Sequence, residues 1–456
     1  AVVFAVSDTA AAIAASSSDA LDEATSVTAS TTATQAQADT IAAFGTAVVY
    51  NVSGTAAEIV AASAGARNEA VNITITGDAT IAQATTAEDA TNSGTVTVGT
   101  ISDTAAAIAA STNAVIANSA GAVTASTAAT QAQADTIAAF GQAVVYNVSG
   151  TAAEIVAASA GARNEAVNIT ITGDATIAQA TTAEDATNSG TVTVGTISDT
   201  AAAIAASTNA VIANSAGAVT ASTAATVAQA TTIDAFAKAV VFAVSDTAAA
   251  IAASSSAALD EATSVTVSNS GSIAQLAAID ALYGTITYTS VSDTASSLVT
   301  NTGSYVTGSK DVTITGSVNV TQLKAINALT SGGITLNVTN DSLFGTAEDI
   351  AAAFAGTVTT HTGTVIITDE PTSAELKTIN DATTGSITLN DVDGALSGTA
   401  SDLVDGFAGT ITEHTGNVTV TDTATIAQLT TIDAATTGTI TVDSITDTAA
   451  AIAAST

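Results

Sequence analysis

Two patterns of hydrophobic and polar residues alternate along the chain. Short runs such as Val71–Thr76 (VNITIT) place an aliphatic residue at every second position, which is typical of a half-buried β-strand. Longer runs rich in Ala, such as residues 425–435 (TIAQLTTIDAA), follow the short runs and begin with helix-start signals. The short runs start roughly 22–30 residues apart, which predicts about 19 strand-plus-helix units of about 24 residues each.

The Ala-rich runs begin with residues that cap helices. Thr80 and Gln83 fit the capping box, in which Ser or Thr is followed three residues later by Glu or Gln, and the pattern recurs at residues 425–428. A second kind of start has Asp and Thr before the sequence AAAIAAS, as at Ser102–Thr104. Because helices of two or three turns are marginally stable alone, we expect these helices to need neighbouring units to pack against.

The units are also repeated in a larger block. Residues 34–129 recur as residues 130–225 with a single substitution, in which Thr46 of the first copy is replaced by Gln142 of the second. Strict internal repetition of this kind is the signature of a repeat array. Because whole units were copied, the array can lengthen without a break in its register, which indicates a product selected for length.

This organisation predicts an α/β solenoid. The strands of successive units would form one long parallel sheet backed by Ala-rich helices, since small side chains let helices approach more closely than the usual ~8–10 Å. We expect residues 1–238 to be regular repeats and residues 239–456 to continue them in more divergent form, with no separate globular domain. The alternative is an all-β solenoid in which the Ala-rich runs are turns; the capping boxes favour helices.

Composition restricts the partners of the chain. Six Lys and Arg residues stand against 41 Asp and Glu residues, so the formal net charge is −35. A field of this sign opposes binding to nucleic acid and to anionic lipid. No apolar run approaches the ~18–20 residues that a membrane-spanning helix needs, so we expect no insertion into a membrane. The chain has no Cys, which excludes disulfides and thiol chemistry.

Aspartate recurs at the predicted strand-to-helix junctions. Stacking of the units would align some of these carboxylates in a file, and Ca²⁺ binds clusters of hard oxygen ligands. Helix capping accounts for the same residues without a metal, and the Gly-rich nonapeptide of calcium-binding repeats is absent. Calcium therefore stays a candidate beside capping, and we expect no other cofactor. The candidate calcium ligands are Asp8, Asp103, Asp199, Asp246, Asp293 and Asp447.

The chain carries no pattern of a catalytic site. It lacks the GxSxG, HExxH, P-loop and dinucleotide-binding motifs, and we expect it not to be an enzyme. His361 and His414 are the only histidines and stand at equivalent positions of a second local repeat. No other His, Cys or acid cluster lies between them, so we expect a role at the surface or at a coil corner rather than in a metal site.

Threonine recurs at alternate positions of several predicted strands, as in residues 95–97, 285–289 and 439–441. Stacked strands would align these residues in flat rows of hydroxyl and methyl groups, similar to the Thr-x-Thr faces of solenoid ice-binding proteins. Thr is also a good polar β-former, so a solvated parallel sheet of any function has similar rows. Sequons for N-glycosylation occur at Asn51, Asn72, Asn147, Asn168, Asn319, Asn337, Asn340 and Asn417.

The repeat units resemble those of known proteins. ISDTAAAIAAST (residues 101–112) and TIAQLTTIDAATTGTITV (residues 425–442) are similar to the repeat regions of very large secreted and surface proteins, adhesin-like and S-layer-like, of Gram-negative bacteria and cyanobacteria. The resemblance covers essentially the whole chain. It implies export, an extracellular or cell-surface location, and a role in a scaffold, layer or filament.

These observations lead us to expect a structural protein, a rigid solenoid building block of an extracellular filament, sheath or surface layer. Its partner would be itself, through end-to-end or lateral association. The alternative is the spacer of a giant bacterial adhesin, and a third hypothesis is an ice- or surface-binding module with a Thr ladder. Residues 1–18 match residues 239–256 letter for letter, so we expect the chain to be a window onto a longer array.

Overall fold

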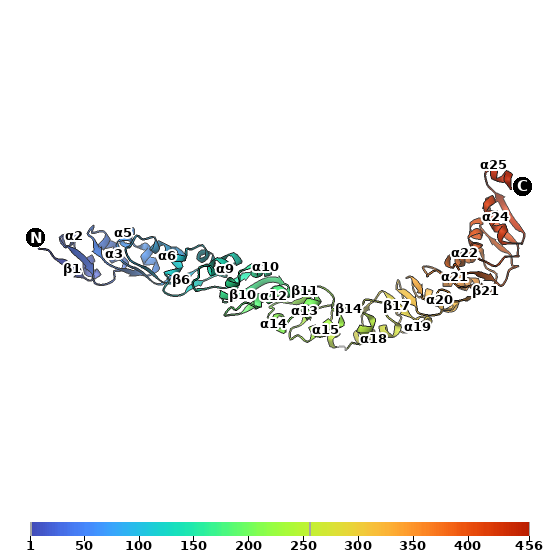
Figure 1. Ribbon diagram of the computed structural model, residues 1–456, viewed down its shortest axis with the longest axis horizontal. Helices are drawn as coiled ribbons and strands as arrows, with labels where there is room; N and C mark the ends of the chain where they lie inside the picture. The colour runs from blue at the N-terminus through green and yellow to red at the C-terminus, as the bar shows by residue number, and fades with distance from the viewer. Residues whose placement is uncertain (1, 255–256, 456) are drawn as a thin grey trace. The chain divides into compact units, whose positions relative to one another are not determined.

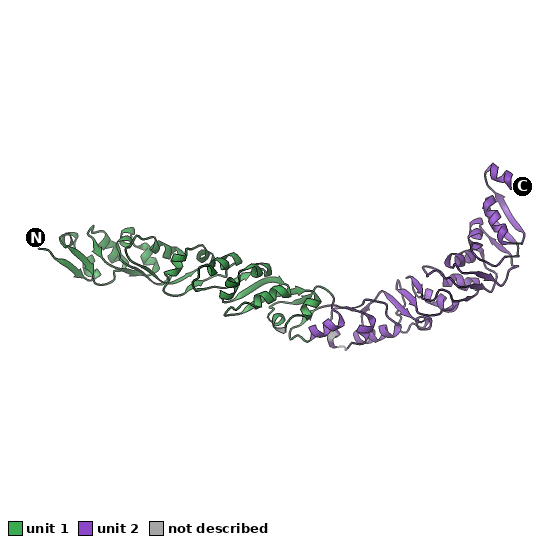
Figure 2. Cartoon of the chain, viewed as in Figure 1, with its two compact units in different colours: residues 1–223, 235–241 green, residues 224–234, 242–456 purple. Residues whose placement is uncertain are grey.

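The computed structural model describes residues 2–254 and 257–455. In this part of the chain, 25 strands and 25 helices follow one another in a repeating order, as Figure 1 shows. The chain divides into two compact units, which Figure 2 distinguishes by colour. Unit 1 comprises residues 1–223 and 235–241, and unit 2 comprises residues 224–234 and 242–456. The expected change of repeat character at residue 238 stays a prediction.

Unit 1 holds 13 strands and 14 helices among its described residues. Its strands are β1 (Ala5–Asp8), β2 (Ser26–Ala29), β3 (Val48–Val49), β4 (Val52–Gly54), β5 (Ile73–Ala79), β6 (Val96–Asp103), β7 (Val123–Ala125), β8 (Val144–Val145), β9 (Val148–Gly150), β10 (Ile169–Ala175), β11 (Val192–Asp199), β12 (Val219–Ala221) and β13 (Val240–Val241). Its helices are α1 (Ala10–Ala14), α2 (Ser18–Leu21), α3 (Gln35–Ala42), α4 (Ala56–Ala61), α5 (Ala64–Glu69), α6 (Ile81–Glu88), α7 (Ala105–Ala109), α8 (Asn113–Ala117), α9 (Gln131–Ala138), α10 (Ala152–Ala157), α11 (Ala160–Glu165), α12 (Ile177–Glu184), α13 (Ala201–Ala205) and α14 (Asn209–Ala213).

Unit 2 holds 12 strands and 11 helices among its described residues. Its strands are β14 (Val244–Asp246), β15 (Val265–Val267), β16 (Ile286–Thr287), β17 (Ser290–Asp293), β18 (Asp311–Ile314), β19 (Ile334–Leu336), β20 (Leu343–Gly345), β21 (Val365–Ile367), β22 (Ile387–Leu389), β23 (Leu396–Gly398), β24 (Val418–Ala424) and β25 (Ile440–Ile445). Its helices are α15 (Val227–Asp234), α16 (Ala248–Ala252), α17 (Ala257–Asp260), α18 (Ile273–Tyr283), α19 (Ala295–Thr300), α20 (Val320–Asn327), α21 (Ala347–Ala353), α22 (Ser373–Ala382), α23 (Ala400–Gly406), α24 (Ile426–Ala435) and α25 (Ala449–Ala454).

All strand pairs in the described residues are parallel, and each joins a strand to the next coil along the chain. We use "coil" for one stretch of strand with the helix or helices that follow it. Val52, for example, pairs with Ile73, and Ile73 pairs with Val96. Parallel neighbours need a crossover connection, and here the short helices supply it. The fold is therefore α/β with parallel sheets built from repeated strand–helix coils, as the sequence patterns predict.

The prediction of one long sheet is wrong, because the strands form seven small sheets in the described residues. Unit 1 has one sheet of three strands and two of five, and unit 2 has four sheets of three. The breaks follow from unequal numbers of residues in neighbouring coils. Thr28 pairs with Val49, and Ala33 pairs with Val52. The first residues of these two pairs lie five positions apart in the earlier coil, whereas their partners lie only three positions apart in the later coil. The ladder is interrupted there, and β4 pairs onward with the next coil.

The core of each coil is thin and aliphatic. Ile73 and Ile75 point inward from β5 and are almost completely buried. The helices cover them with Ile and Ala, as in α6, where Ala84 and Ala87 have no exposed surface. Helix α4 packs on α6 of the next coil; small side chains allow helices to lie this close at the spacing of parallel strands. No helix in the described residues has both the length and the apolar character needed to span a membrane.

Candidate functional site: side chains that join neighbouring coils

A single carboxylate caps two helices in neighbouring coils. Asp103 Oδ1 accepts a hydrogen bond from the backbone N–H of Thr104, the N-cap of α7, at 2.7 Å. Asp103 Oδ2 accepts from the backbone N–H of Ile81, the first residue of α6 in the preceding coil, at 3.0 Å. The first N–H groups of a helix have no partner inside the helix, and a negative charge at this end also complements the helix dipole. Asp103 therefore fixes one helix start relative to another.

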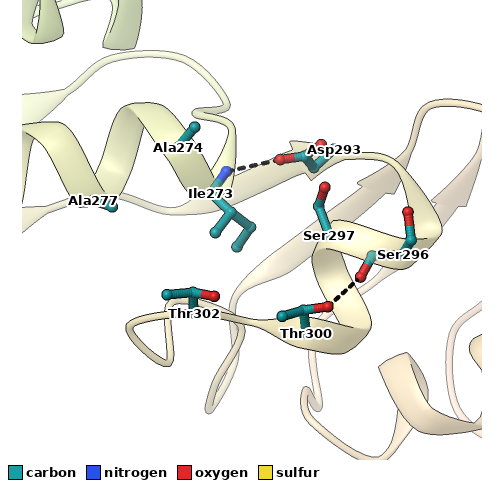
Figure 3. A pocket seen from close by; sticks show the side chains of 8 residues that line it. All are labelled: Ile273, Ala274, Ala277, Asp293, Ser296, Ser297, Thr300 and Thr302. Atoms are coloured by element: carbon teal, nitrogen blue, oxygen red, sulfur yellow. Dashed lines mark hydrogen bonds between the residues drawn. The ribbon is translucent and has the colours of Figure 1, made fainter.

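Four of the other candidate aspartates make the same pair of bonds, with Oδ1 to the next residue and Oδ2 to the preceding coil. Figure 3 shows the bond from Ile273 N–H to Asp293. The acceptors are Asp199 (from Ile177 at 2.9 Å), Asp246 (from Val227 at 3.0 Å), Asp293 (from Ile273 at 3.0 Å) and Asp447 (from Ile426 at 3.0 Å). Asp8 accepts from Thr9 N–H at 2.7 Å. The six residues that the sequence singles out are therefore helix caps.

Other side chains make the inter-coil bond where Asp is absent. Thr127 Oγ1 accepts from Ala105 N–H at 3.1 Å, and Asn269 Oδ1 accepts from Ala248 N–H at 2.8 Å. In unit 2, Asp369 Oδ1 accepts from Ala347 N–H at 2.7 Å. Further bonds of this kind run from Ala10 to Thr31, from Ala201 to Thr223 and from Ala400 to Asp422. Eleven helix starts in the described residues are thus held by a side chain of the following coil.

Two coils of unit 1 that begin with Gly-Thr, at Gly54 and Gly150, cap their own helices instead. Gly54 stands where other coils have Asp, and Thr55 N–H donates to Glu58 Oε2 at 2.7 Å within the same helix. The hydrogen bonds from the backbone N–H and the hydroxyl of Thr55 hold the pKa of Glu58 below its ordinary value. A side chain at Gly54 would place Cβ 3.0 Å from Glu58 Oε2. An Asp before the N-cap and a Glu at the third helical position are therefore two ways to supply an acceptor for the backbone N–H of the N-cap residue.

The candidate aspartates do not form a file, contrary to expectation. The strand partners of Asp103 and Asp293 in the next coil are Ala125 and Ile314. The reason is that consecutive coils differ in their helix starts, so a carboxylate in one coil meets an aliphatic residue in the next. Across residues 2–254 and 257–455, no three His, Asp or Glu side chains form a group that could hold a metal ion.

The two histidines are buried, which excludes the surface and leaves the other expected position, a coil corner. His361 Nε2 lies 2.8 Å from the carbonyl oxygen of Asp341, and Nδ1 lies 3.3 Å from Thr383 Oγ1. The ring also packs 5.8 Å from that of Phe354. Burial lowers the pKa of His361, and the same cause lowers the pKa of His414, whose side chain is only 4% exposed. Both imidazoles are inter-coil contacts and favour the neutral form.

A ladder of amide side chains joins three coils along the sheet. Asn72 donates to Asn51 Oδ1 from its backbone N–H at 3.1 Å and from Nδ2 at 2.9 Å. Asn72 Oδ1 then accepts from the backbone N–H and the hydroxyl of Thr95 at 2.9 and 3.0 Å. The ladder is repeated in the second copy of the block at Asn147, Asn168 and Thr191. Two of the sequon asparagines, Asn72 and Asn168, therefore use Nδ2 within the fold.

All six cations of the chain bind within it. Arg67 and Arg163 donate to the carbonyl groups at the ends of α4 and α10. Lys238 and Lys310 donate to backbone carbonyl groups of the preceding coil, those of Ser215 and Tyr288. The remaining two form ion pairs between coils, Lys324 with Asp349 at 2.5 Å and Lys377 with Asp405 at 2.7 Å. No described cation is left without an acceptor inside the chain.

Glycine lines the coil corners where backbones lie closest. A Cβ at Gly416 would lie 1.9 Å from the carbonyl oxygen of Gly394, and a Cβ at Gly438 would lie 1.8 Å from that of Gly416. Real Cβ atoms do not approach so closely, and cores cannot absorb such overlap without backbone shifts. The three glycines therefore set the spacing of successive coils at this corner.

A shallow hollow of about 410 Å³ lies between α18 and α19 in unit 2 (Figure 3). The Asp293 carboxylate at its edge is occupied by Ile273 N–H and Thr294 N–H. Thr300 Oγ1 donates to the Ser296 carbonyl oxygen at 2.8 Å, within α19. The polar groups that line the hollow serve the local helices and do not converge on a common point.

No protein-family model matches the chain, and no curated protein matches it at a significant level. The coil-to-coil contacts are therefore the features of the chain that bear on its function.

Proposed function

We propose that the chain is a structural protein, a rigid solenoid building block of an extracellular filament, sheath or surface layer. The observation that carries the proposal is the serial coupling of coils, in which a side chain of one coil caps the helix of the coil before it, as Asp103 caps Ile81. A load applied along the coils must break these bonds together with the parallel ladders. In this proposal about 19 coils stack as one solenoid.

The charge distribution supports an extracellular scaffold. All six Lys and Arg side chains form hydrogen bonds or ion pairs within the chain, so they do not form a basic patch. The surface is therefore acidic, with a formal net charge of −35. Such a surface disfavours nucleic acid and keeps the particles dispersed until salt screens them. We propose that the partner of the chain is another copy of itself, and that the protein has no enzymatic activity.

Electron microscopy of the native material tests this function. The proposal expects ordered fibres or a lattice with a regular repeat along each fibre. Isolated particles that end in a distinct binding domain would contradict it and favour the second candidate, the spacer of a giant adhesin. The spacer needs the same serial coupling of coils, which is why the structure is compatible with both roles.

The third candidate, an ice- or surface-binding module, has one observation in its favour. Thr74 and Thr97 are direct partners on neighbouring strands, and so are Thr419 and Thr441, which places Thr side chains in rows. The rows are interrupted by other residues, such as Phe344 beside Ile366. An ice-recrystallisation assay decides this point, since activity at micromolar protein would favour the third candidate over the first.

A further inference from the structure

Fifteen outward positions on the unit 1 strands carry uncharged side chains. Strand pairing joins these residues in five runs of three, in which Ser pairs with Thr and Thr pairs with Thr or Val. Successive runs are connected within one coil, as from Val49 to Ser53 and from Thr97 to Ser102, so together they form a stepped row. We call this row the neutral row. Its members are Ser7, Thr28, Val49, Ser53, Thr74, Thr97, Ser102, Thr124, Val145, Ser149, Thr170, Thr193, Ser198, Thr220 and Val241.

The acids of unit 1 lie mostly on other surfaces. Of 18 Asp and Glu residues in unit 1, 13 lie outside its described strands. Three of the other five, Asp8, Asp103 and Asp199, bond to helix starts. The last two, Asp78 and Asp174, accept from Thr hydroxyl groups beyond a bulge at the border of the row. The neutral row is therefore the surface on which two copies can meet with the fewest carboxylates between them.

Exposed valines recur along the neutral row at a constant interval. Val49, Val145 and Val241 are 51%, 45% and 48% exposed, and each stands 96 residues from the next. An interval of four coils corresponds to about 19 Å at the usual spacing of parallel strands. Only a partner with the same interval meets all three valines, and a second copy of the chain has that interval by construction. Because the spacing is equal on both sides of Val145, a copy turned by 180° places Val145 opposite Val145 and Val49 opposite Val241.

We propose that the neutral row of unit 1 docks on the neutral row of a second copy, related by a twofold axis at Val145. Twofold pairs with self-complementary surfaces are the commonest assembly of identical chains. Eleven coils at about 4.8 Å, each presenting about 16 Å of strand, offer roughly 800 Å² per partner, the area of a standard stable interface. The inference rests on the proposed structural role and names the surface through which lateral association occurs.

A matched pair of double variants tests the surface. Val49→Glu with Val145→Glu places two carboxylates on the neutral row, and Val60→Glu with Val156→Glu places them on helices α4 and α10 at the same 96-residue interval. Val60 and Val156 are each 37% exposed, so both pairs alter surface valines. In sedimentation velocity at 0.3 M salt, we expect the wild type and the helix variant to form dimers and the neutral-row variant to lose at least tenfold in affinity. Equal association of both variants overturns the proposal.

A cross-linking experiment tests the twofold axis and separates the two proposals. The chain has no Cys, so Val145→Cys supplies a single thiol, and a short thiol-to-thiol cross-linker should give covalent dimers. Val156→Cys is the control: it should associate like the wild type and give no covalent dimers. Regular fibres in which Val145→Cys does not cross-link would overturn the docking surface and leave the structural function standing. A monomeric wild type that binds ice or an insoluble neutral polysaccharide through the same valines would overturn both.

Discussion

Unit 1 and unit 2 build the same strand–helix coil and stabilise its corners with different side chains. In unit 1, Tyr50 OH donates to the Ala66 carbonyl at 2.8 Å and Arg67 binds the end of α4, which together hold the second helix of the coil. In unit 2, Tyr288 OH makes the equivalent bond to the Tyr305 carbonyl at 2.9 Å, and other coils are held by His361 and by the close glycine contacts near Gly416. No buried side-chain nitrogen or oxygen in the described residues lacks a partner. The parallel backbone ladder determines the shape of the coil. Different side chains can occupy its corners, provided that they form hydrogen bonds with the buried polar groups there.

The largest expected difference between the units concerns their glycine corners. We expect Gly416→Ala in unit 2 to destabilise the chain by about 3 kcal/mol, because its Cβ would overlap the Gly394 carbonyl oxygen. Gly99→Ala in unit 1 should cost less, since its nearest contacts, to the Gly77 backbone, are at 2.8 Å. Urea unfolding followed by circular dichroism measures both. A larger loss for Gly99→Ala would contradict the closer packing assigned to unit 2.

An Asp that caps two helix starts should contribute the same free energy of unfolding in both units. Asp103→Ala in unit 1 and Asp293→Ala in unit 2 each free two helix N–H groups, so we expect about 2 kcal/mol of lost stability in either case. Thr127→Ala, which frees only the N–H of Ala105, is the control and should cost about 1 kcal/mol. Asp103→Asn should recover part of the loss, because one acceptor oxygen remains. Similar losses for Thr127→Ala and Asp103→Ala would show that the second bond contributes nothing.

Acid should distinguish the units, because only unit 2 contains histidine. Burial lowers the pKa of His361 and His414 in the folded chain, so the unfolded chain binds more protons between the two pKa values. The stability of unit 2 is therefore complete above the unfolded pKa of about 6.5 and is lost as pH falls below it. Hydrogen exchange at pH 7 and pH 5.5 should show faster opening around both histidines and no change in unit 1. The double variant His361→Asn with His414→Asn should remove the pH dependence. If the exchange rates of the double variant still changed with pH, titratable groups other than the histidines would be responsible.

The smallest expected difference concerns the cations. Lys324→Met in unit 2 breaks an ion pair whose side chains are 42% and 46% exposed, so we expect only a small loss of stability, which becomes smaller still in high salt. Arg67→Met in unit 1 frees backbone carbonyl groups at the end of α4, and we expect about 1 kcal/mol with little effect of salt. Chemical denaturation at 0.05 and 0.5 M salt separates the two. If the stability losses of the two variants depended equally on salt, Arg67 would act through its charge and not through its hydrogen bonds to the carbonyl groups.

Local signals in the sequence predict the coil well, because each coil is stabilised within a short stretch of chain. The capping boxes of Thr80 with Gln83 and of Thr425 with Gln428 are both formed. The alternation in Val71–Thr76 places Ile73 and Ile75 in the core. These features depend on neighbours within a few residues, which a single sequence displays directly.

Features that depend on the adjacent coil are harder to predict. The second bond of Asp103 goes to Ile81, 22 residues earlier, and the burial of His361 depends on a carbonyl group 20 residues away. One signal for the double cap is nevertheless present at particular starts: after Asp103 and Thr104 the third helical position is Ala107, whose side chain cannot bond back to the N-cap, whereas after Gly54 and Thr55 it is Glu58, whose side chain does. The seven-sheet arrangement depends on residue counts in two coils at once, and no local pattern reports it.

Hydrogen exchange at the first amide of α6 tests the coupling of coils most directly. We predict that the amide of Ile81 exchanges slowly in the wild type and at least tenfold faster after Asp103→Ala, although the two residues lie in different coils. The equivalent amide of Ile177, held by the intact Asp199, should stay slow in the same sample. An Ile81 amide whose exchange rate does not respond to the loss of Asp103 would contradict the claim that each coil is capped by the next.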